Sequence, residues 1–282
     1  MELAPLPAHL VEEAARRALA EDLGAAGDIT SNACIPPDLA SRAVIAARTP
    51  GIIAGIDLAL AAFRLVDPAI KIDVKCGDGG AVKSGGAVLA IEGPSRGILA
   101  AERVALNFLG HLSGIATATA GLVEAVKGTK AHIVCTRKTT PGLRAFEKHA
   151  VLCGGGRNHR FGLYDAVLIK DNHIAAAGGI AKALKAAKAS VGHMVKIEVE
   201  VDSLAGLEEA LRHGADIVML DNMSVDDMKR AVALAAGRAL LEASGNVTIE
   251  TARAIAETGV DIISSGSITH SAPALDLGLD FG

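Results

Sequence analysis

Short apolar runs alternate with amphipathic segments through the second half of the chain. Six runs have the composition of buried strands, at residues 131–135, 166–169, 195–201, 216–220, 239–243 and 261–264. Four segments between them have helical periodicity, at residues 180–189, 203–212, 225–236 and 248–257. Strand–helix alternation of this kind predicts parallel strands. Because no GxGxxG motif follows the first strand, the pattern favours an α/β fold with a (β/α) barrel over a dinucleotide-binding fold.

The first part of the chain mixes element types and predicts a separate α+β domain. Helical patterns fall at residues 8–21, 57–66 and 100–112, and strand patterns fall at residues 42–54, 70–74 and 87–91. We therefore expect an N-terminal α+β domain over 1–112 and a barrel domain over 113–267. The remaining tail, 268–282, is expected to pack back on the N-terminal domain.

One uncharged stretch, residues 104–123, is about as long as a bilayer-spanning helix. It contains Asn107, His111, Ser113, Thr117, Thr119 and three glycines. A buried helix explains this mixture better than a membrane span, so we expect no membrane partner. The N-terminal sequence has neither a basic start nor an apolar core typical of a signal peptide. We therefore expect a cytoplasmic protein.

Composition and charge narrow the function classes. Half of the 282 residues are apolar, six are aromatic, and the net charge is −4. An acidic chain with few aromatic side chains is not typical of a nucleic-acid binder. The four cysteines (34, 76, 135 and 153) form no CxxC pair, so we expect small buried side chains and no zinc site or disulfide framework.

Polar residues follow or end every apolar run of the second half. Lys138 follows the first run, Lys170 the second and Asp221 the fourth, while Glu200 lies near the end of the third. In a (β/α) barrel these strand ends converge on one face, where active sites are built. Polar strand ends that only meet water are the plainer alternative.

Positive charge is concentrated between residues 136 and 173. This segment has seven Lys or Arg and three acidic residues, so its charge is 7 − 3 = +4 and the rest of the chain has −8. A focused positive patch in an acidic protein predicts a small, multiply anionic ligand. Arg144 and Lys148 are expected on the solvated face of a helix that opens at Pro141. The stronger candidates are Arg137, Lys138, His159, Arg160 and Lys170.

The last two strands carry small polar residues suited to phosphate. Ser244-Gly245-Asn246 and Ser265-Gly266-Ser267 offer hydroxyls and backbone N–H groups, at the barrel position where many barrels bind phosphate. Glu200 and Asp221 end neighbouring strands and would suit Mg²⁺ with retained waters. Both acids could instead be salt-bridge partners of the nearby cations.

Longer motifs link the chain to a known family. They include GDITS (27–31), AERVALNFLGHLSGIAT (101–117), TRKTTPGLR (136–144), GGGRNHRFGLYD (154–165), LIKDNHI (168–174), EVEVDSL (198–204), MLDNM (219–223) and ETGVDIISSGSITHSAPALDLGLD (257–280). Together these segments resemble the quinolinate phosphoribosyltransferases over nearly the whole chain. The resemblance implies a seven-stranded barrel after an N-terminal α+β domain, and a homodimer.

The resemblance also implies a reaction and a site. The phosphoribosyl group of phosphoribosyl pyrophosphate would pass to quinolinate with loss of CO2, giving nicotinate mononucleotide and pyrophosphate. The quinolinate and phosphoribosyl pocket would contain Arg137, Lys138, His159, Arg160 and Lys170. Arg103 would reach the neighbouring subunit's site. Glu200 and Asp221 would face the ribose and the Mg²⁺–pyrophosphate, directly or through water, and Lys138, Lys170, Glu200 and Asp221 would carry the catalysis.

The implied 5′-phosphate site contains Ser244, Gly245, Gly266 and Ser267. One position departs from the family pattern, because Asn246 stands where a second glycine is common. Three alternatives stay open: an aldolase using Lys170 as a Schiff base, a related phosphoribosyltransferase for another base, and a non-catalytic binding barrel.

Overall fold

The computed structural model describes residues 3–282, which divide into two compact units. Unit 1 contains the described residues up to Ala120, together with Ala145–Gly155 and Ser271–Gly282. Unit 2 contains Gly121–Arg144 and Gly156–His270. The chain therefore enters unit 2, returns to unit 1 for one helix, and returns again at its end.

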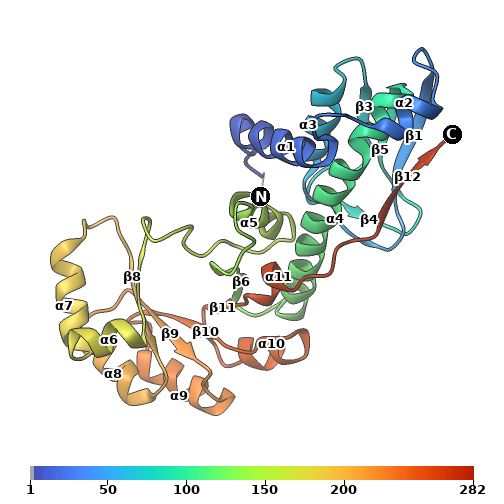
Figure 1. Ribbon diagram of the computed structural model, residues 1–282. Helices are drawn as coiled ribbons and strands as arrows, with labels where there is room; N and C mark the ends of the chain where they lie inside the picture. The colour runs from blue at the N-terminus through green and yellow to red at the C-terminus, as the bar shows by residue number, and fades with distance from the viewer. Residues whose placement is uncertain (1–2) are drawn as a thin grey trace. The chain divides into compact units, whose positions relative to one another are not determined.

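Unit 1 is built on a four-stranded antiparallel sheet in the order β12-β1-β5-β3 (Figure 1). Its strands are β1 (Ala40–Ala47), β2 (Gly51–Ile52), β3 (Lys71–Val74), β4 (Ala81–Val82), β5 (Ala87–Pro94) and β12 (Leu277–Phe281). Its helices are α1 (Ala8–Leu23), α2 (Ile29–Cys34), α3 (Ile56–Val66), α5 (Arg144–Cys153) and most of α4 (Ser95–Ala125). Ile45, Phe63 and Leu89 have no exposed surface and lie at the centre of the core. Because β12 pairs with β1, residues 277–281 of the tail do pack on this α+β unit.

Helix α4 contains the uncharged stretch, and it is the single described helix that is long and apolar enough to cross a membrane. Its polar side chains are used inside unit 1. Ser113 Oγ accepts the Ala54 N–H at 3.0 Å, and Thr117 Oγ1 accepts the Ile52 N–H at 2.9 Å. A Cβ atom on Gly114 would lie 2.1 Å from the Pro273 carbonyl oxygen, so glycine is needed where the tail crosses the helix. The helix has low charge because it is the packing surface of this unit.

The predicted domain boundary after residue 112 falls inside α4, which continues without a break to Ala125. The division into units comes later, after Ala120, because Gly110 and Gly114 still contact the tail. Helix α5 belongs to unit 1 although it lies in the middle of the predicted barrel segment. The family resemblance and the strand pattern do not reveal this excursion.

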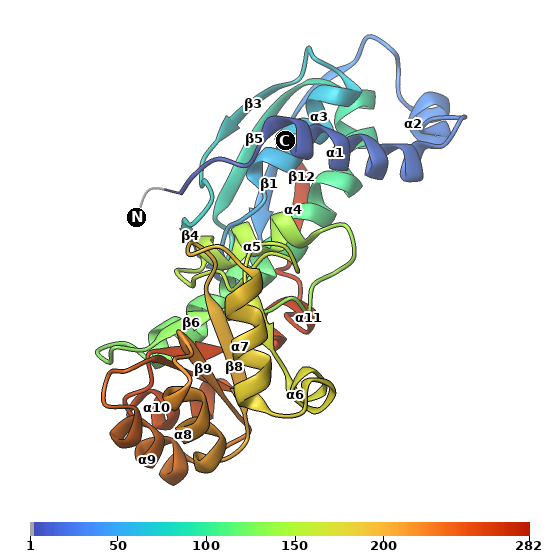
Figure 2. The ribbon, with the colours of Figure 1, turned by 90° about the vertical axis from the view of Figure 1, so that its left-hand side faces the viewer.

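Unit 2 contains a six-stranded parallel sheet in the order β6-β11-β10-β9-β8-β7. The strands match the six predicted apolar runs: β6 (His132–Val134), β7 (Val167–Ile169), β8 (Ile197–Val201), β9 (Ile217–Asp221), β10 (Leu240–Ser244) and β11 (Ile262–Ser264). The helices are α6 (Asp171–Ala177), α7 (Ile180–Ser190), α8 (Leu204–Arg212), α9 (Val225–Ala235), α10 (Ile249–Ala256) and α11 (Ser267–His270). Helices α7 to α10 pack against the strands of this sheet (Figure 2).

The seventh strand implied by the resemblance is reduced to one residue. Arg157 makes an isolated parallel bridge to Val134, with the Arg157 N–H bonded to the Ile133 carbonyl at 2.8 Å. Gly154 and Gly155 come just before it, and glycine does not sustain a strand. The sheet of the described chain therefore has six strands and this single bridge.

Candidate active site

A cavity of about 540 Å³ lies at the carboxyl ends of the parallel strands of unit 2. It is lined by Thr136, Arg137, Lys138, His159, Arg160, Leu168, Lys170, Glu200, Met219, Asp221, Asn222, Glu242, Ser244 and Ser264. Eight of these residues are among those predicted from the sequence. The strand ends thus converge as the alternation pattern predicts.

Strand geometry explains which side chains face the cavity. Residues spaced two apart line the cavity at four strand ends, with the buried acid Glu198 as the one exception to lining. The pairs are 168 and 170 on and just after β7, 198 and 200 on β8, 219 and 221 on β9, and 242 and 244 on β10. Successive side chains of a strand point to opposite faces, so residues two apart share a face. The spacing therefore places Glu198 below Glu200, and Glu242 below Ser244.

Lys138 and Arg137 follow β6 in a loop that unit 2 fixes at both ends. The Lys138 N–H donates to Thr136 Oγ1 at 3.0 Å, and Thr269 Oγ1 donates to the Lys138 carbonyl at 2.8 Å. These bonds hold the backbone while the ammonium stays exposed. A preformed cation at this position can meet an anionic ligand with little reorganisation.

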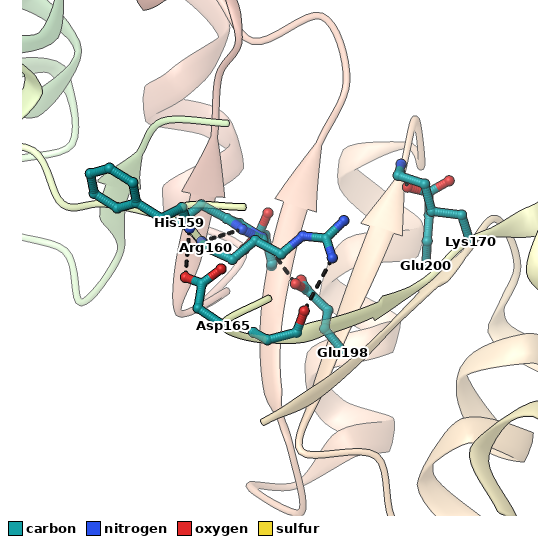
Figure 3. A network of polar contacts seen from close by, with 9 residues as sticks. His159, Arg160, Asp165, Lys170, Glu198 and Glu200 are labelled. Carbon is teal, nitrogen blue, oxygen red and sulfur yellow. Dashed lines mark hydrogen bonds and ion pairs between the residues drawn. The ribbon is translucent and has the colours of Figure 1, made fainter. Parts of the chain in front are cut away.

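Lys170 and Glu200 form an ion pair at the ends of β7 and β8, through Lys170 Nζ and Glu200 Oε2 (Figure 3). Lys170 is about half exposed and Glu200 is 15% exposed, so the pair borders the cavity. Asp221 ends β9, and its Oδ2 accepts the Asn222 amide at 3.0 Å. Two carboxylates therefore reach the cavity from adjacent strands, as the sequence predicts.

Arg160 is held by its own loop. Its guanidinium donates to the Ala166 carbonyl at 3.1 Å, and Asp165 accepts the N–H groups of Phe161 and Gly162 at 2.6 and 2.8 Å. Burial, followed by the charge of Arg137, lowers the pKa of Arg160, while Glu198 and Asp165 oppose that shift. Arg160 and Arg137 are close enough to repel, which favours an anion between them.

His159 lies beside two acids, Glu198 and Glu242, that are absent from the predicted binding set. Its Nε2 is 3.0 Å from Glu198 Oε2 and 3.7 Å from Glu242 Oε2. Both acids are buried, at 4% and 2% exposure. The available signal was an acidic residue inside an apolar run, two positions before a predicted site residue.

Ser244 lines the cavity, and the loop after it explains the departure at residue 246. Gly245 has φ +103°, and a Cβ atom there would lie 2.1 Å from Asn222 Oδ1. Asn246 has φ +48°, a left-handed conformation that asparagine tolerates better than most residues. Asparagine in place of a second glycine therefore keeps the loop conformation.

Gly266 and Ser267 do not line the cavity themselves. A Cβ atom on Gly266 would lie 2.9 Å from Lys138 Cδ, so the glycine leaves room for that side chain. Ser267 Oγ lies 2.8 Å from Ser265 Oγ. Both residues lie beside β11, which neighbours β10, so the two predicted phosphate loops are adjacent.

Three further expectations concern residues outside the cavity. Arg103 is exposed on α4 in unit 1, and its donation to a neighbouring subunit stays a prediction. The prediction of a solvated Lys148 was wrong, because its side chain has no exposed surface. Such complete burial is rare for a charged residue. Four buried cysteines were expected, but Cys34 is exposed and Cys76 is partly exposed.

Comparisons with known proteins show which family the chain is similar to. The model for the quinolinate phosphoribosyl transferase N-terminal domain matches residues 28–113, and that for its C-terminal domain matches residues 115–280. The nicotinate-nucleotide pyrophosphorylase [carboxylating] of Mycobacterium leprae is 45% identical, with 94% of this chain and 95% of that protein covered. The nicotinate-nucleotide pyrophosphorylase structure from Francisella tularensis is 43% identical with a TM-score of 0.95, and covers 100% of this chain and 99% of that one.

Proposed function

Because the chain belongs to the quinolinate phosphoribosyltransferase family, we propose that it transfers the phosphoribosyl group of phosphoribosyl pyrophosphate to quinolinate with loss of CO2. The products are nicotinate mononucleotide, pyrophosphate and CO2. The observation that carries this proposal is the meeting of Arg137, Lys138, Arg160 and Lys170 in one cavity. Quinolinate has two carboxylates and the donor has several phosphate charges, so both substrates need such a cluster.

The cations bind and orient the two anions. Arg137 and Arg160 suit carboxylates, because a guanidinium donates two parallel hydrogen bonds, while Lys138 and Lys170 act as point charges. Ser244 and the adjoining glycine loops suit the 5′-phosphate. Holding both substrates in one cavity converts an encounter in solution into a reaction between positioned groups.

The transfer step does not require a general base. The lone pair of the pyridine nitrogen forms the bond to ribose C1, and the C1–O bond breaks with its electron pair going to pyrophosphate. Pyridine nitrogen carries no proton that must be removed. The positive ring nitrogen then favours loss of CO2, since the bond from ring C2 to its carboxylate breaks with the electron pair staying on C2, which takes a proton from water. The cations stabilise the charge that develops on pyrophosphate.

Glu200 and Asp221 have the donor chemistry that Mg²⁺ prefers, since both present carboxylate oxygens to a cavity with room for water. Glu200 pairs with Lys170 through Oε2, which leaves Oε1 for a cation or a ribose hydroxyl. When bound, Mg²⁺ would neutralise pyrophosphate charge. We propose these two residues as its holders, directly or through water.

We also propose a homodimer in which Arg103 contributes to the neighbouring site. Its support is the family resemblance and the exposure of the Arg103 side chain on α4. Mixing Arg103→Ala with Lys138→Ala protein should then restore part of the activity, because one site of the mixed dimer keeps both residues. No recovery despite proven subunit exchange would contradict the shared site.

Turnover tests the reaction directly. Purified protein is given phosphoribosyl pyrophosphate, Mg²⁺ and either quinolinate or nicotinate, and mononucleotide and CO2 are followed. We expect product from quinolinate alone. Product from nicotinate alone, or from neither in folded protein, would contradict the proposal, and borohydride trapping of Lys170 with a carbonyl substrate would instead favour the aldolase alternative.

A further inference from the structure

Glu242 is the one acid lining the cavity that the proposed reaction does not use. It lies on β10 behind Ser244 and has 2% of its surface exposed. Glu198 approaches from β8, and His159 approaches from the loop before β7. Figure 3 shows His159 directed toward Glu198, apart from the Lys170–Glu200 pair. The three polar side chains thus form one cluster, in which His159 and Glu242 line the cavity and Glu198 is buried beside them.

The hydrogen bonds of His159 fix which nitrogen has the proton. The Arg160 backbone N–H donates to His159 Nδ1 at 2.7 Å, so Nδ1 is an acceptor. Nε2 must then have the hydrogen of a neutral ring, and it donates to Glu198 Oε2 at 3.0 Å. Glu242 Oε2, at 3.7 Å, is beyond hydrogen-bonding distance of that nitrogen. The one N–H of this tautomer therefore serves Glu198 rather than Glu242.

Two buried carboxylates facing one neutral ring cannot easily both be ionised. Glu198 Oε1 and Glu242 Oε1 are both buried with no hydrogen-bond partner among the described residues. An unpaired buried oxygen is costly on an ionised carboxylate, whereas a carboxylic acid tolerates such a position far better. Of the two acids, Glu198 is the one stabilised as an anion, since it accepts from His159 and lies near the charge of Arg160.

Burial and the charge of Glu198 both favour the protonated form of Glu242. Burial comes first and the charge of Glu198 second, and together they raise the pKa of Glu242 to about 7. His159 and the Ser264 hydroxyl on β11 oppose the shift. The proton of Glu242 would therefore be lost around neutral pH, with about half of the molecules ionised near pH 7.

We propose that Glu242 is a positioning residue that works as a neutral carboxylic acid, so that Glu198 alone holds the His159 ring against the substrate cavity. Ionisation of Glu242 would put a second negative charge behind the cations that bind the substrates. It would also compete with Glu198 for the His159 proton. The proposal rests on the proposed reaction for its effect on substrates, but its protonation state can be measured without turnover.

Kinetics of two variants separate a neutral acid from a carboxylate. Glu242→Gln keeps the shape of the side chain and its neutral charge, whereas Glu242→Ala removes the side chain that lies beside His159 and Glu198. We expect Glu242→Ala to raise the KM for quinolinate about 10-fold at pH 7, in the range typical of residues that orient a binding group. We expect the KM of the parent protein to rise above pH 7. Glu242→Gln should recover most of the loss seen in Glu242→Ala and should lack that rise. Glu208→Gln, an exposed acid on α8, is the matched control and should follow the parent profile.

Two kinetic outcomes would overturn the proposal. Equal losses in Glu242→Gln and Glu242→Ala would mean that the carboxylate itself is needed. A rise in KM with pH that persists unchanged in Glu242→Gln would mean that another group titrates. Thermal unfolding of each variant checks that it is folded.

Difference infrared spectroscopy of the resting protein reads the proton directly. We expect a carboxylic-acid C=O band at pH 6 that fades between pH 7 and 8, is absent in Glu242→Gln and persists in Glu208→Gln. Absence of this band in the parent protein would overturn the proposal. If the band is present but quinolinate is not turned over, the proposed reaction fails while the neutral acid stands, so the two failures are distinguishable.

Discussion

The two units each bury a histidine between an acid and another titratable group, but the two clusters differ in how completely their polar atoms are paired. In unit 1, Asp78 Oδ1 accepts the Ile56 N–H at 3.0 Å and Asp78 Oδ2 lies 3.0 Å from His149 Nε2. Cys153 completes this cluster, and burial together with the charge of Asp78 raises the pKa of its thiol to about 12. Both oxygens of the acid are used, and the thiol stays protonated.

The cluster of His159, Glu198 and Glu242 in unit 2 has too few hydrogen-bond donors to pair every oxygen of its two carboxylates. Each of its carboxylates keeps a buried oxygen without a partner among the described residues, and Glu242 borders the substrate cavity. Similar residue types thus serve two ends. A fully paired cluster holds one fold in place, whereas an incompletely paired one beside a cavity responds to protons and ligands.

The largest effect should come from the cavity. Lys138→Ala should lower kcat/KM at least about 100-fold, because it removes one preformed charge from the site of developing negative charge. Lys138 is exposed, so the melting temperature should stay within a few degrees of the parent protein. Turnover and thermal unfolding of the same preparation check both points, and near-normal turnover would move the active site elsewhere.

A change in the unit 1 cluster should affect stability instead. Asp78→Ala leaves the Ile56 N–H and His149 without their acceptor, and should lower the free energy of unfolding by about 2–4 kcal/mol. The folded fraction should keep its specific activity. Urea unfolding gives the first quantity, and Asp78→Asn, which keeps an acceptor oxygen, should lose less. A loss of activity without a loss of stability would break the contrast between the clusters.

The pH dependence of stability tests the unpaired acid. Because the pKa of Glu242 is raised from 4.5 to about 7, the folded protein binds more protons than the unfolded chain between these values. Its contribution therefore falls as pH rises from about 4.5 to 7, and is constant above that range. Glu242→Gln removes this loss. Its stability relative to the parent should increase across the window by about 1–3 kcal/mol, measured by urea unfolding at several pH values; a constant difference would contradict the assigned acid.

The smallest effect is expected at Cys153. With a pKa near 12, about 1 in 10,000 of its thiols is ionised at pH 8, and the thiolate is the reactive form. An alkylating reagent should modify the exposed Cys34 first and reach Cys153 only when the protein unfolds. Peptide mass spectrometry over time measures this order, and activity should persist after Cys34 is modified. Early modification of Cys153 would show that unit 1 opens readily.

The spacing of apolar residues along the sequence was enough to predict the individual strands and helices of unit 2. The apolar runs and amphipathic segments predicted the six parallel strands and the helices α7 to α10, because periodicity of 2 or 3.6 residues follows from strand and helix geometry. Because parallel strands end at the same edge of a sheet, the sequence also predicted that Lys138, Lys170, Glu200 and Asp221 lie close together, and all four line one cavity.

Burial and pairing of polar side chains depend on contacts between residues far apart in sequence. The sequence either did not predict these features or predicted them wrongly. Lys148 lies in a charged run that is typical of a solvated helix face, yet α5 is buried in unit 1. The uncharged helix α4 owes its composition to Ala54, Ile52 and the returning tail, which lie far from it in sequence. The roles of Glu198 and Glu242 appear only when β8, β10 and the His159 loop are brought together.

The sequence by itself determined the order of strands and helices, the family and the cations of the site, because these follow from residue type and spacing along one chain. The tertiary structure decided which polar groups are buried, which are paired and which are left over. Burial and pairing change the free energy of a charge by far more than its neighbours in sequence do. For that reason Glu242, an acid in an apolar run that was not among the predicted site residues, becomes a titratable part of the site only in the folded protein.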